Sequence, residues 1–212
     1  MNKHITTLLG GACLLGSALA AQAVEVAGNV AIGSDYPFRG VSQTDRDPTI
    51  QGGFDVAFES GFYVGTWGSN VSGFVDTSME WDLYGGFKGT LSDEATYDLR
   101  YIRYEYPGNG SLYDYNEYHA IVTWGAFTFG VAYSEEYFAL EDVSWVYPNV
   151  GYTISLPAEA SLVIKAGYSM TEDNDAGEWE ASFGDEEVLD WSVMYSIPVA
   201  GVSFNIGVVG TD

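Results

Sequence analysis

Carboxylates and a few bases stand at alternate positions within otherwise apolar segments, and they are the main candidates for chemistry in this sequence. Between residues 79 and 91, Glu80, Asp82 and Lys88 fall on one parity, whereas Trp81 and Leu83 fall on the other. Alternate side chains of a β-strand point to the same face of its sheet. Applied along the chain, this rule assigns the following residues to one common face: Asp35, Arg39, Asp55, Glu80, Asp82, Lys88, Asp98, Arg100, Glu117, His119, Lys165 and Asp190.

Two interpretations of this charged face are open. The charges pair or are solvated and simply keep an interior polar, or the excess of Asp and Glu forms a constriction that favours cations. In the stretch SDYPFRGVSQT, residues 34–44, the same parity places Tyr36 and Phe38 on the outer face, at the rim of a strand. Asp35 and Arg39 then form an opposite-charge pair on the inner face.

Catalytic chemistry has little support. The sequence contains no GxSxG, HExxH, P-loop or CxxC motif, and His119 is its only histidine after residue 23. A general base needs a partner that orients it, and His119 fits better as a hydrogen-bonded interior residue. We therefore expect no enzymatic activity, no cofactor and no metal site.

The composition restricts the class of protein further. The net charge of −23 leaves no basic surface for phosphates, so we expect no nucleic acid partner. An aromatic content of 16% and a mean hydropathy near zero argue against a disordered acidic chain. The single cysteine, Cys13, lies in the N-terminal segment, so no disulfide is expected in the remaining chain.

Residues 1–23 have the features of a secretory signal peptide. Lys3 and His4 provide a basic start, an apolar run follows, and residues 21–23 (AQA) provide a cleavage site, with a cut after Ala20 nearly as good. The apolar run is short for a membrane helix, which needs roughly 20 apolar residues. Cleavage near Ala23 would leave 30 acids against 6 bases, because only Lys3 is lost.

The remaining chain, residues 24–212, has a period of two and no convincing helical stripe. Short and long connections alternate between its segments, which is typical of outer-membrane barrels with short periplasmic turns and long outer loops. A soluble β-sandwich is the alternative, but it gives no reason for this regular alternation. The pattern predicts eleven strands, near 24–38, 50–59, 62–70, 79–90, 95–106, 116–125, 127–134, 145–156, 160–170, 188–197 and 201–209.

The fold class expected is therefore all-β, an antiparallel up-and-down transmembrane β-barrel of about twelve strands. Aromatic residues toward the strand ends, such as Trp81, Trp124 and Trp191, fit interfacial girdles. Single-chain bacterial barrels have an even number of strands. We therefore expect a twelfth strand beyond Asp212.

The expected outer loops are strongly acidic. Two of them carry most of the acids: Glu135, Glu136, Glu141 and Asp142 in one, and Glu172, Asp173, Asp175, Glu178, Glu180, Asp185, Glu186 and Glu187 in the other. The segment DNDAG, residues 173–177, is similar to a calcium loop, but its glycine is one place early for an EF-hand. A solvated acidic surface is the favoured interpretation, and weak divalent-cation binding is the alternative.

The chain also resembles a known family, the TorF family of proteobacterial outer-membrane porins. The resemblance rests on SDYPFRGVSQT and on TIQGGFDVAFESGFYVGTWGSNV, residues 49–71, in that order and spacing. It implies an outer-membrane β-barrel with a transport role. It implies no catalytic residues and identifies no substrate.

The function expected is an outer-membrane channel for passive diffusion of small hydrophilic solutes, with a preference for cations. Its partners would be the lipid of the bacterial outer membrane and the solutes or cations that pass. The first alternative is a non-conducting barrel whose acidic loops serve surface binding or envelope structure. The second is a soluble secreted β-protein that binds calcium or a sugar.

Overall fold

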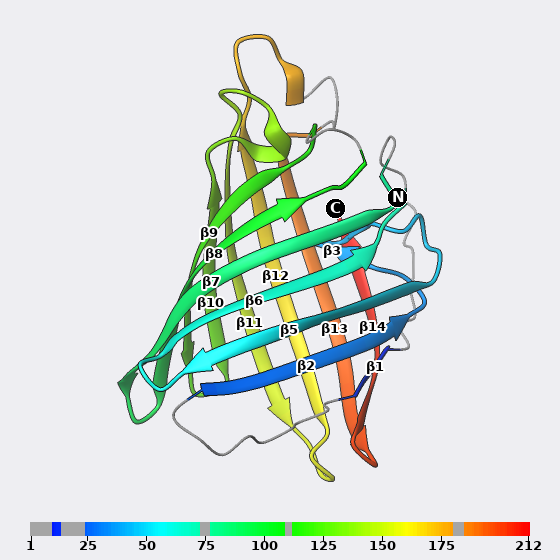
Figure 1. Cartoon of the computed structure of the whole chain (residues 1–212), viewed down its shortest axis with the longest axis vertical. Helices are drawn as coiled ribbons and strands as arrows, with labels where there is room; N and C mark the ends of the chain where they lie inside the picture. Colours follow the sequence, from blue (N-terminus) through cyan, green and yellow to red (C-terminus); the bar gives the residue numbers. More distant parts are fainter. Residues whose placement is uncertain (1–9, 14–23, 73–76, 109–111, 180–184) are drawn as a thin grey trace.

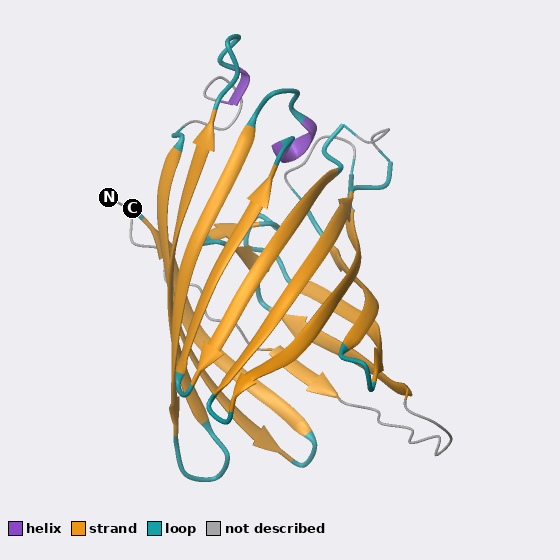
Figure 2. Cartoon of the chain, turned by 90° about the vertical axis from the view of Figure 1, so that its left-hand side faces the viewer, coloured by secondary structure: helices purple, strands orange, loops and turns teal. Residues whose placement is uncertain are grey.

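Twelve antiparallel strands form one continuous sheet in the computed structural model, which describes residues 10–13, 24–72, 77–108, 112–179 and 185–212. Each strand from β5 onward pairs with the next along the chain, and the sheet curls into a barrel with tilted strands (Figures 1 and 2). The strands of this sheet are β1 (Gly10–Cys13), β2 (Val24–Gly33), β5 (Thr49–Phe58), β6 (Phe62–Asn70), β7 (Met79–Ser92), β8 (Ala95–Glu105), β9 (Tyr115–Trp124), β10 (Phe127–Ser134), β11 (Ser144–Ser155), β12 (Ser161–Glu172), β13 (Glu187–Val199) and β14 (Val202–Thr211).

The two edges of the sheet meet through β1, which pairs with β14 and also contacts β2. β1 falls within the predicted signal peptide, and the rest of residues 1–23 lies outside the described residues. Cleavage near Ala23 and a twelfth strand beyond Asp212 therefore stay predictions. The eleven strands predicted after residue 23 are all present, and the bounds of ten of them agree to within a few residues.

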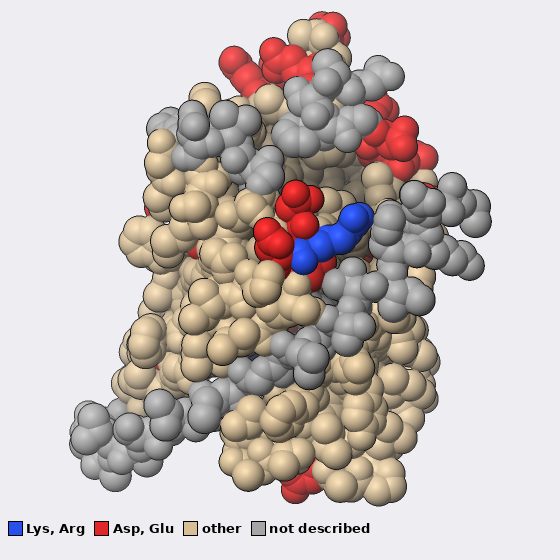
Figure 3. Space-filling model, turned by 90° about the vertical axis from the view of Figure 1, so that its right-hand side faces the viewer, with Lys and Arg blue, Asp and Glu red and all other residues tan. Residues whose placement is uncertain are grey.

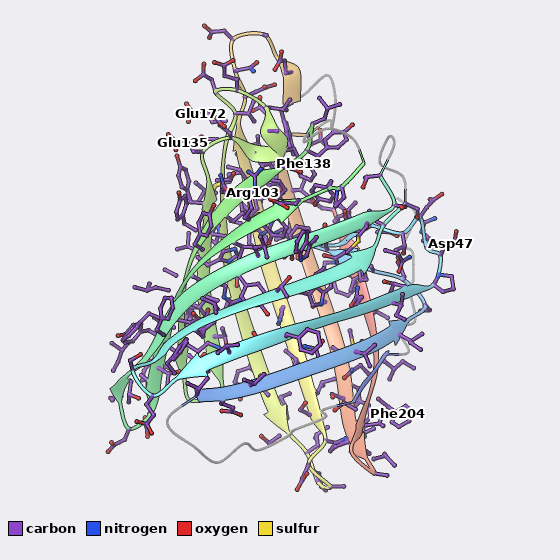
Figure 4. The ribbon with its side chains drawn as sticks, viewed as in Figure 1. Asp47, Arg103, Glu135, Phe138, Glu172 and Phe204 are labelled. Atoms are coloured by element: carbon purple, nitrogen blue, oxygen red, sulfur yellow. The ribbon has the colours of Figure 1, made fainter. Side chains whose placement is uncertain are left out.

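The two ends of the barrel differ as predicted. At one end, called the turn end here, short links join β5 to β6 and β13 to β14, whereas long segments such as 34–48 and 135–143 stand at the opposite loop end (Figure 2). Figure 4 shows Glu135 and Glu172 at the loop end and Phe204 at the turn end. This alternation arises because neighbouring strands run in opposite directions around a single sheet.

The outward faces of the strands are apolar. Ile32, Phe54 and Leu91, for example, are each at least 60% exposed. Figure 3 shows one side of the barrel, where uncharged residues cover most of the middle and lower surface and acidic residues gather toward the loop end. Within the described residues, no helix is long and apolar enough to cross a membrane.

Most of the buried aromatic residues lie inside the barrel, near the loop end. The ring of Tyr115 stacks on that of Tyr104 with a centroid distance of 4.6 Å, and Tyr137 stacks on Trp145 at the same distance. Tyr137 belongs to η1 (Tyr137–Ala139), a short 3-10 turn whose residues fold toward the interior. This aromatic cluster fills part of the lumen beside β8, β9 and β11.

The first predicted strand, 24–38, was too long, because β2 ends at Gly33. The chain then forms a small hairpin of β3 (Pro37–Phe38) and β4 (Val41–Ser42), which lies between the walls of the barrel (Figures 1 and 2). We call residues 34–48 the inward loop. The prediction that Tyr36 and Phe38 face lipid was wrong, because the alternation of faces ends where the chain leaves the sheet.

Candidate functional site: the inward loop and the charged lumen

The inward loop is held in shape by its own polar groups. The Asp35 carboxylate accepts hydrogen bonds from Ser42 Oγ at 2.6 Å and Thr44 Oγ1 at 2.9 Å. Arg39 and Gly40 both have positive φ, of 48° and 82°. Two such residues form the tight turn that joins antiparallel strands with a matching twist. The loop therefore presents Arg39 at its tip.

Arg39 binds Glu117 of β9 through both of its terminal nitrogens. The Nη1–Oε1 distance is 2.8 Å and the Nη2–Oε2 distance is 2.7 Å. The guanidinium carbon also lies 4.0 Å from the centroid of Trp145 and 4.7 Å from that of Tyr147, both on β11. A bidentate pair of this kind fixes orientation as well as charge. It attaches the tip of the loop to the far wall of the barrel.

The same carboxylate has further partners. His119 Nε2 lies 2.8 Å from Glu117 Oε2, and the Tyr104 hydroxyl donates to that oxygen at 3.3 Å. Glu117 is fully buried. His119 is thus a hydrogen-bonded interior residue, and the predicted Asp35–Arg39 pair does not form, because each of the two has partners elsewhere.

Tyr36 and Gly40 attach the loop to two further walls. The Tyr36 hydroxyl donates to Glu80 Oε1 on β7 at 2.7 Å, and Tyr106 donates to the other oxygen at 2.6 Å. A Cβ atom at Gly40 would lie 2.5 Å from Cγ2 of Thr211 on β14, so the loop backbone touches that strand directly. The inward loop therefore crosses the lumen.

Burial and neighbouring charges together set the protonation of Arg39, Tyr36 and Tyr137. Burial acts to lower the pKa of Arg39, but the neighbouring Glu117 carboxylate outweighs it, so that pKa lies well above its usual value. Burial, together with Glu80, raises the pKa of Tyr36 well above its usual value. Burial likewise raises the pKa of Tyr137, although Arg39 opposes the shift. At neutral pH, Arg39 is therefore charged and both phenols are donors.

Nearer the turn end, the lumen carries a different set of charges. Arg100 pairs with Asp98, which also accepts a hydrogen bond from Tyr63 at 2.6 Å. Lys88 lies over the Tyr63 ring, 4.5 Å from its centroid. A recess of about 450 Å³ is lined here by Lys88, Asp98 and Arg100, among others.

The twelve residues assigned to the inner face by parity all lie on the lumen side, but their charges are separated along the barrel axis. The loop-side set has five acids and one base: Asp35, Glu80, Asp82, Glu117, Asp190 and Arg39. The turn-side set has two acids and three bases: Asp55, Asp98, Lys88, Arg100 and Lys165, with His119 between the two sets. The negative charge of the lumen is therefore concentrated at the loop end.

Several residues of the site were not predicted. Tyr36 and Phe38 were assigned to the wrong face, and the ring partners of Arg39 on β11 were not recognised. Trp145 and Tyr147 share one parity on their strand, and this was the available signal. It was incomplete, because nothing near them in the sequence indicates that a loop more than a hundred residues earlier supplies the cation.

The segment 173–177 has a structural use that does not involve an ion. Asp173 Oδ1 accepts hydrogen bonds from the backbone amides of Asn174 at 2.8 Å and Trp179 at 2.9 Å. Asn174 Oδ1 accepts from the amides of Ala176 and Glu178. Among the described residues, no group of three or more His, Cys, Asp or Glu is placed to hold a metal ion.

The bond from Tyr36 to Glu80 gives a first test of the site. We expect Tyr36→Phe to lower the free energy of unfolding by about 1–3 kcal/mol, because a buried carboxylate loses a donor. Urea titration of the refolded barrel would measure this change. The matched control is Tyr168→Phe, whose hydroxyl donates to Glu187 at the same distance of 2.7 Å on the exposed surface. Equal losses in the two variants would contradict the expectation.

Comparison with solved structures gives two distant likenesses. The crystal structure of OprD from Pseudomonas aeruginosa has 10% identity and a TM-score of 0.39, and the match covers 88% of this chain and 66% of OprD. That of OccAB4 from Acinetobacter baumannii has 13% identity and a TM-score of 0.42, and the match covers 93% of this chain and 63% of OccAB4. The chain thus spans less than two thirds of either protein.

No curated protein sequence matches the chain. One family of sequences does. A family described as "Bacterial protein of unknown function (Gcw_chp)" matches residues 17–212, and the chain therefore belongs to this family.

Proposed function

We propose that this protein is an outer-membrane channel for passive diffusion of small hydrophilic solutes, with a preference for cations. The apolar outer face of the strands suits contact with lipid, and the charged lumen suits contact with water. The resemblance of residues 34–71 to the TorF porin family points the same way. Export by a signal peptide cleaved near Ala23 completes the proposal.

The observation that carries the cation preference is the axial separation of charge. A solute entering from the loop end first meets the acidic outer loops. It then meets the loop-side set, which consists of five lumen acids and the base Arg39. Fixed negative charge in a narrow, low-dielectric passage attracts cations and repels anions. The three bases of the turn-side set lie beyond this region.

A second candidate is a non-conducting barrel whose acidic loops bind outside the cell. The inward loop and the aromatic cluster favour it, because Glu117 and Trp145 are at most 1% exposed and the lumen is well filled at their level. In a channel, solutes would have to pass beside the inward loop, or the loop would have to move.

Conductance across a planar lipid bilayer tests the proposal directly. We expect discrete current steps from the refolded barrel, and under a KCl gradient a reversal potential whose sign corresponds to K⁺ selectivity. Folding would be checked first, by the mobility shift on heating in detergent gels. An anion-selective reversal potential would contradict the cation preference alone. Silence from correctly folded protein would contradict the channel and favour the second candidate.

A further inference from the structure

Asp82 differs from the other buried acids of the lumen. It is 8% exposed, and its Oδ1 atom has no hydrogen-bond partner among the described residues. Its side chain also forms no ion pair with any residue that the structure describes. The other buried lumen acids, by contrast, all have partners: Asp35, Glu80, Asp98, Glu117 and Asp190.

The surroundings of Asp82 are aromatic on both sides. It stands opposite Trp67 of β6 and opposite Tyr104 of β8 in the sheet register. The ring of Trp67 packs edge-on against Tyr36, with centroids 5.4 Å apart, and the ring of Tyr104 packs against Phe38 at 6.1 Å. Asp82 therefore lies in the lumen wall between two aromatic side chains that touch the inward loop.

The nearby charges leave Asp82 uncompensated. Glu80 and Glu117 are the charged groups that act on it, and both are acidic. Glu80 is two positions along the same face, which is about 7 Å along a strand. Arg39 is the base that acts on Glu80, and both of its terminal nitrogens bind Glu117. A buried carboxylate with no counter-charge is costly, and either a proton or a bound cation removes that cost.

We propose that Asp82 binds a small monovalent cation such as K⁺ within the lumen, between Trp67 and Tyr104. This inference deepens the proposed function, on which it rests, by naming the residue at which a permeant cation loses part of its water. One free carboxylate balances one positive charge. Ca²⁺ sites combine several carboxylates, and Glu80 and Glu117 near Asp82 already accept hydrogen bonds from other residues.

Thermal unfolding of the full chain, refolded in detergent, provides the test. KCl is compared with N-methylglucamine chloride at equal ionic strength, so that screening is matched and only the small cation differs. A ligand that binds only the folded state raises the melting temperature in a concentration-dependent way. We expect K⁺ to raise it above the value in N-methylglucamine, and Asp82→Asn to abolish the difference.

The control is Asp98→Asn. Asp98 is equally buried, at 9% exposed, but it is bound to Arg100 and Tyr63. This variant is expected to be less stable yet to keep the response to K⁺. Loss of the response in both variants would overturn the assignment to Asp82. The assignment would also be overturned if the melting temperature of the wild-type protein rose on acidification but not with K⁺, because a proton would then neutralise Asp82.

Bilayer recording separates this inference from the proposed function. In conducting protein, Asp82→Asn should move the reversal potential toward zero. An unchanged reversal potential would overturn the Asp82 site and leave the channel standing. If the folded protein is silent, the channel proposal fails, and the melting experiment still decides whether Asp82 binds K⁺.

Discussion

Replacing Arg39 with methionine is expected to lower the free energy of unfolding by about 3–5 kcal/mol, the typical cost of breaking one side of a buried ion pair. The reason is that Glu117 is fully buried and would lose its bidentate partner, with His119 and Tyr104 as its remaining contacts. Methionine retains much of the length that packs between the rings of Phe38 and Trp145. Urea titration of the refolded barrel, followed by tryptophan fluorescence, would measure the loss.

Two variants show whether this loss comes from the buried charge. Arg39→Met combined with Glu117→Gln should recover a large part of the lost stability, because a neutral amide then replaces the buried carboxylate. Arg103→Met is the matched control: Arg103 pairs with Asp114 and Glu105, but its side chain is 31% exposed. Pairs of that kind contribute about 0–1 kcal/mol. Equal losses at Arg39 and Arg103 would contradict the special role of the buried pair.

The same substitution should change conduction. Arg39→Met removes the base of the loop-side set and releases the tip of the inward loop from β9. If the protein conducts, we expect larger current steps and a stronger preference for K⁺. Larger steps with unchanged selectivity would mean that the loop narrows the lumen but that its charge does not select ions.

The strands and their inner faces were predictable because the alternation of faces is a local property of an extended chain. Glu80, Asp82 and Lys88 alternate with Trp81 and Leu83 in the sequence, and any strand through them must send the two groups to opposite sides. Strands with one apolar and one polar face preserve this contrast over ten or more residues. Ten of the eleven predicted strands therefore agree closely with the structure.

The inward loop was not predictable in the same way. Parity carries no information once the chain leaves the sheet, and Tyr36 and Phe38 lie beyond Gly33, where β2 ends. Their inward position depends on Glu80, Tyr104 and other residues distant in the sequence. The local signal was the glycine after Arg39, which permits a two-residue turn. It indicates a hairpin but not the side of the barrel wall on which the hairpin lies.

The sequence could not show that Asp82 Oδ1 lacks a described hydrogen-bond partner, for a related reason. In the sequence it is one of seven equivalent acids on the inner face. It differs from Glu80 only because the hydroxyls of Tyr36 and Tyr106 reach Glu80 and no described donor reaches Asp82. Which acid is left without a partner depends on side-chain packing across the lumen, and that packing follows from the placement of the inward loop.

Gly40→Ala is the second substitution with a large expected effect. Gly40 has φ of +82°, and an added Cβ would lie 2.5 Å from Cγ2 of Thr211 and 3.2 Å from Cβ of Asp190. The left-handed backbone costs a non-glycine residue about 1–2 kcal/mol, and overpacking adds about 1–3 kcal/mol. We therefore expect a loss of about 2–5 kcal/mol in the free energy of unfolding, measured by urea titration.

Gly201→Ala separates the two contributions. Gly201 has nearly the same backbone conformation, with φ of +84°, but no atom lies within 4 Å of an added Cβ. It should lose only the backbone contribution, so the difference between the two variants measures the contact of the inward loop with β14. Combining Thr211→Ala with Gly40→Ala should recover part of that difference, because Thr211→Ala removes the Cγ2 atom that the added Cβ would meet. If Gly40→Ala and Gly201→Ala lose the same amount, the hairpin tip does not press against the wall, and the loop is free to move without strain.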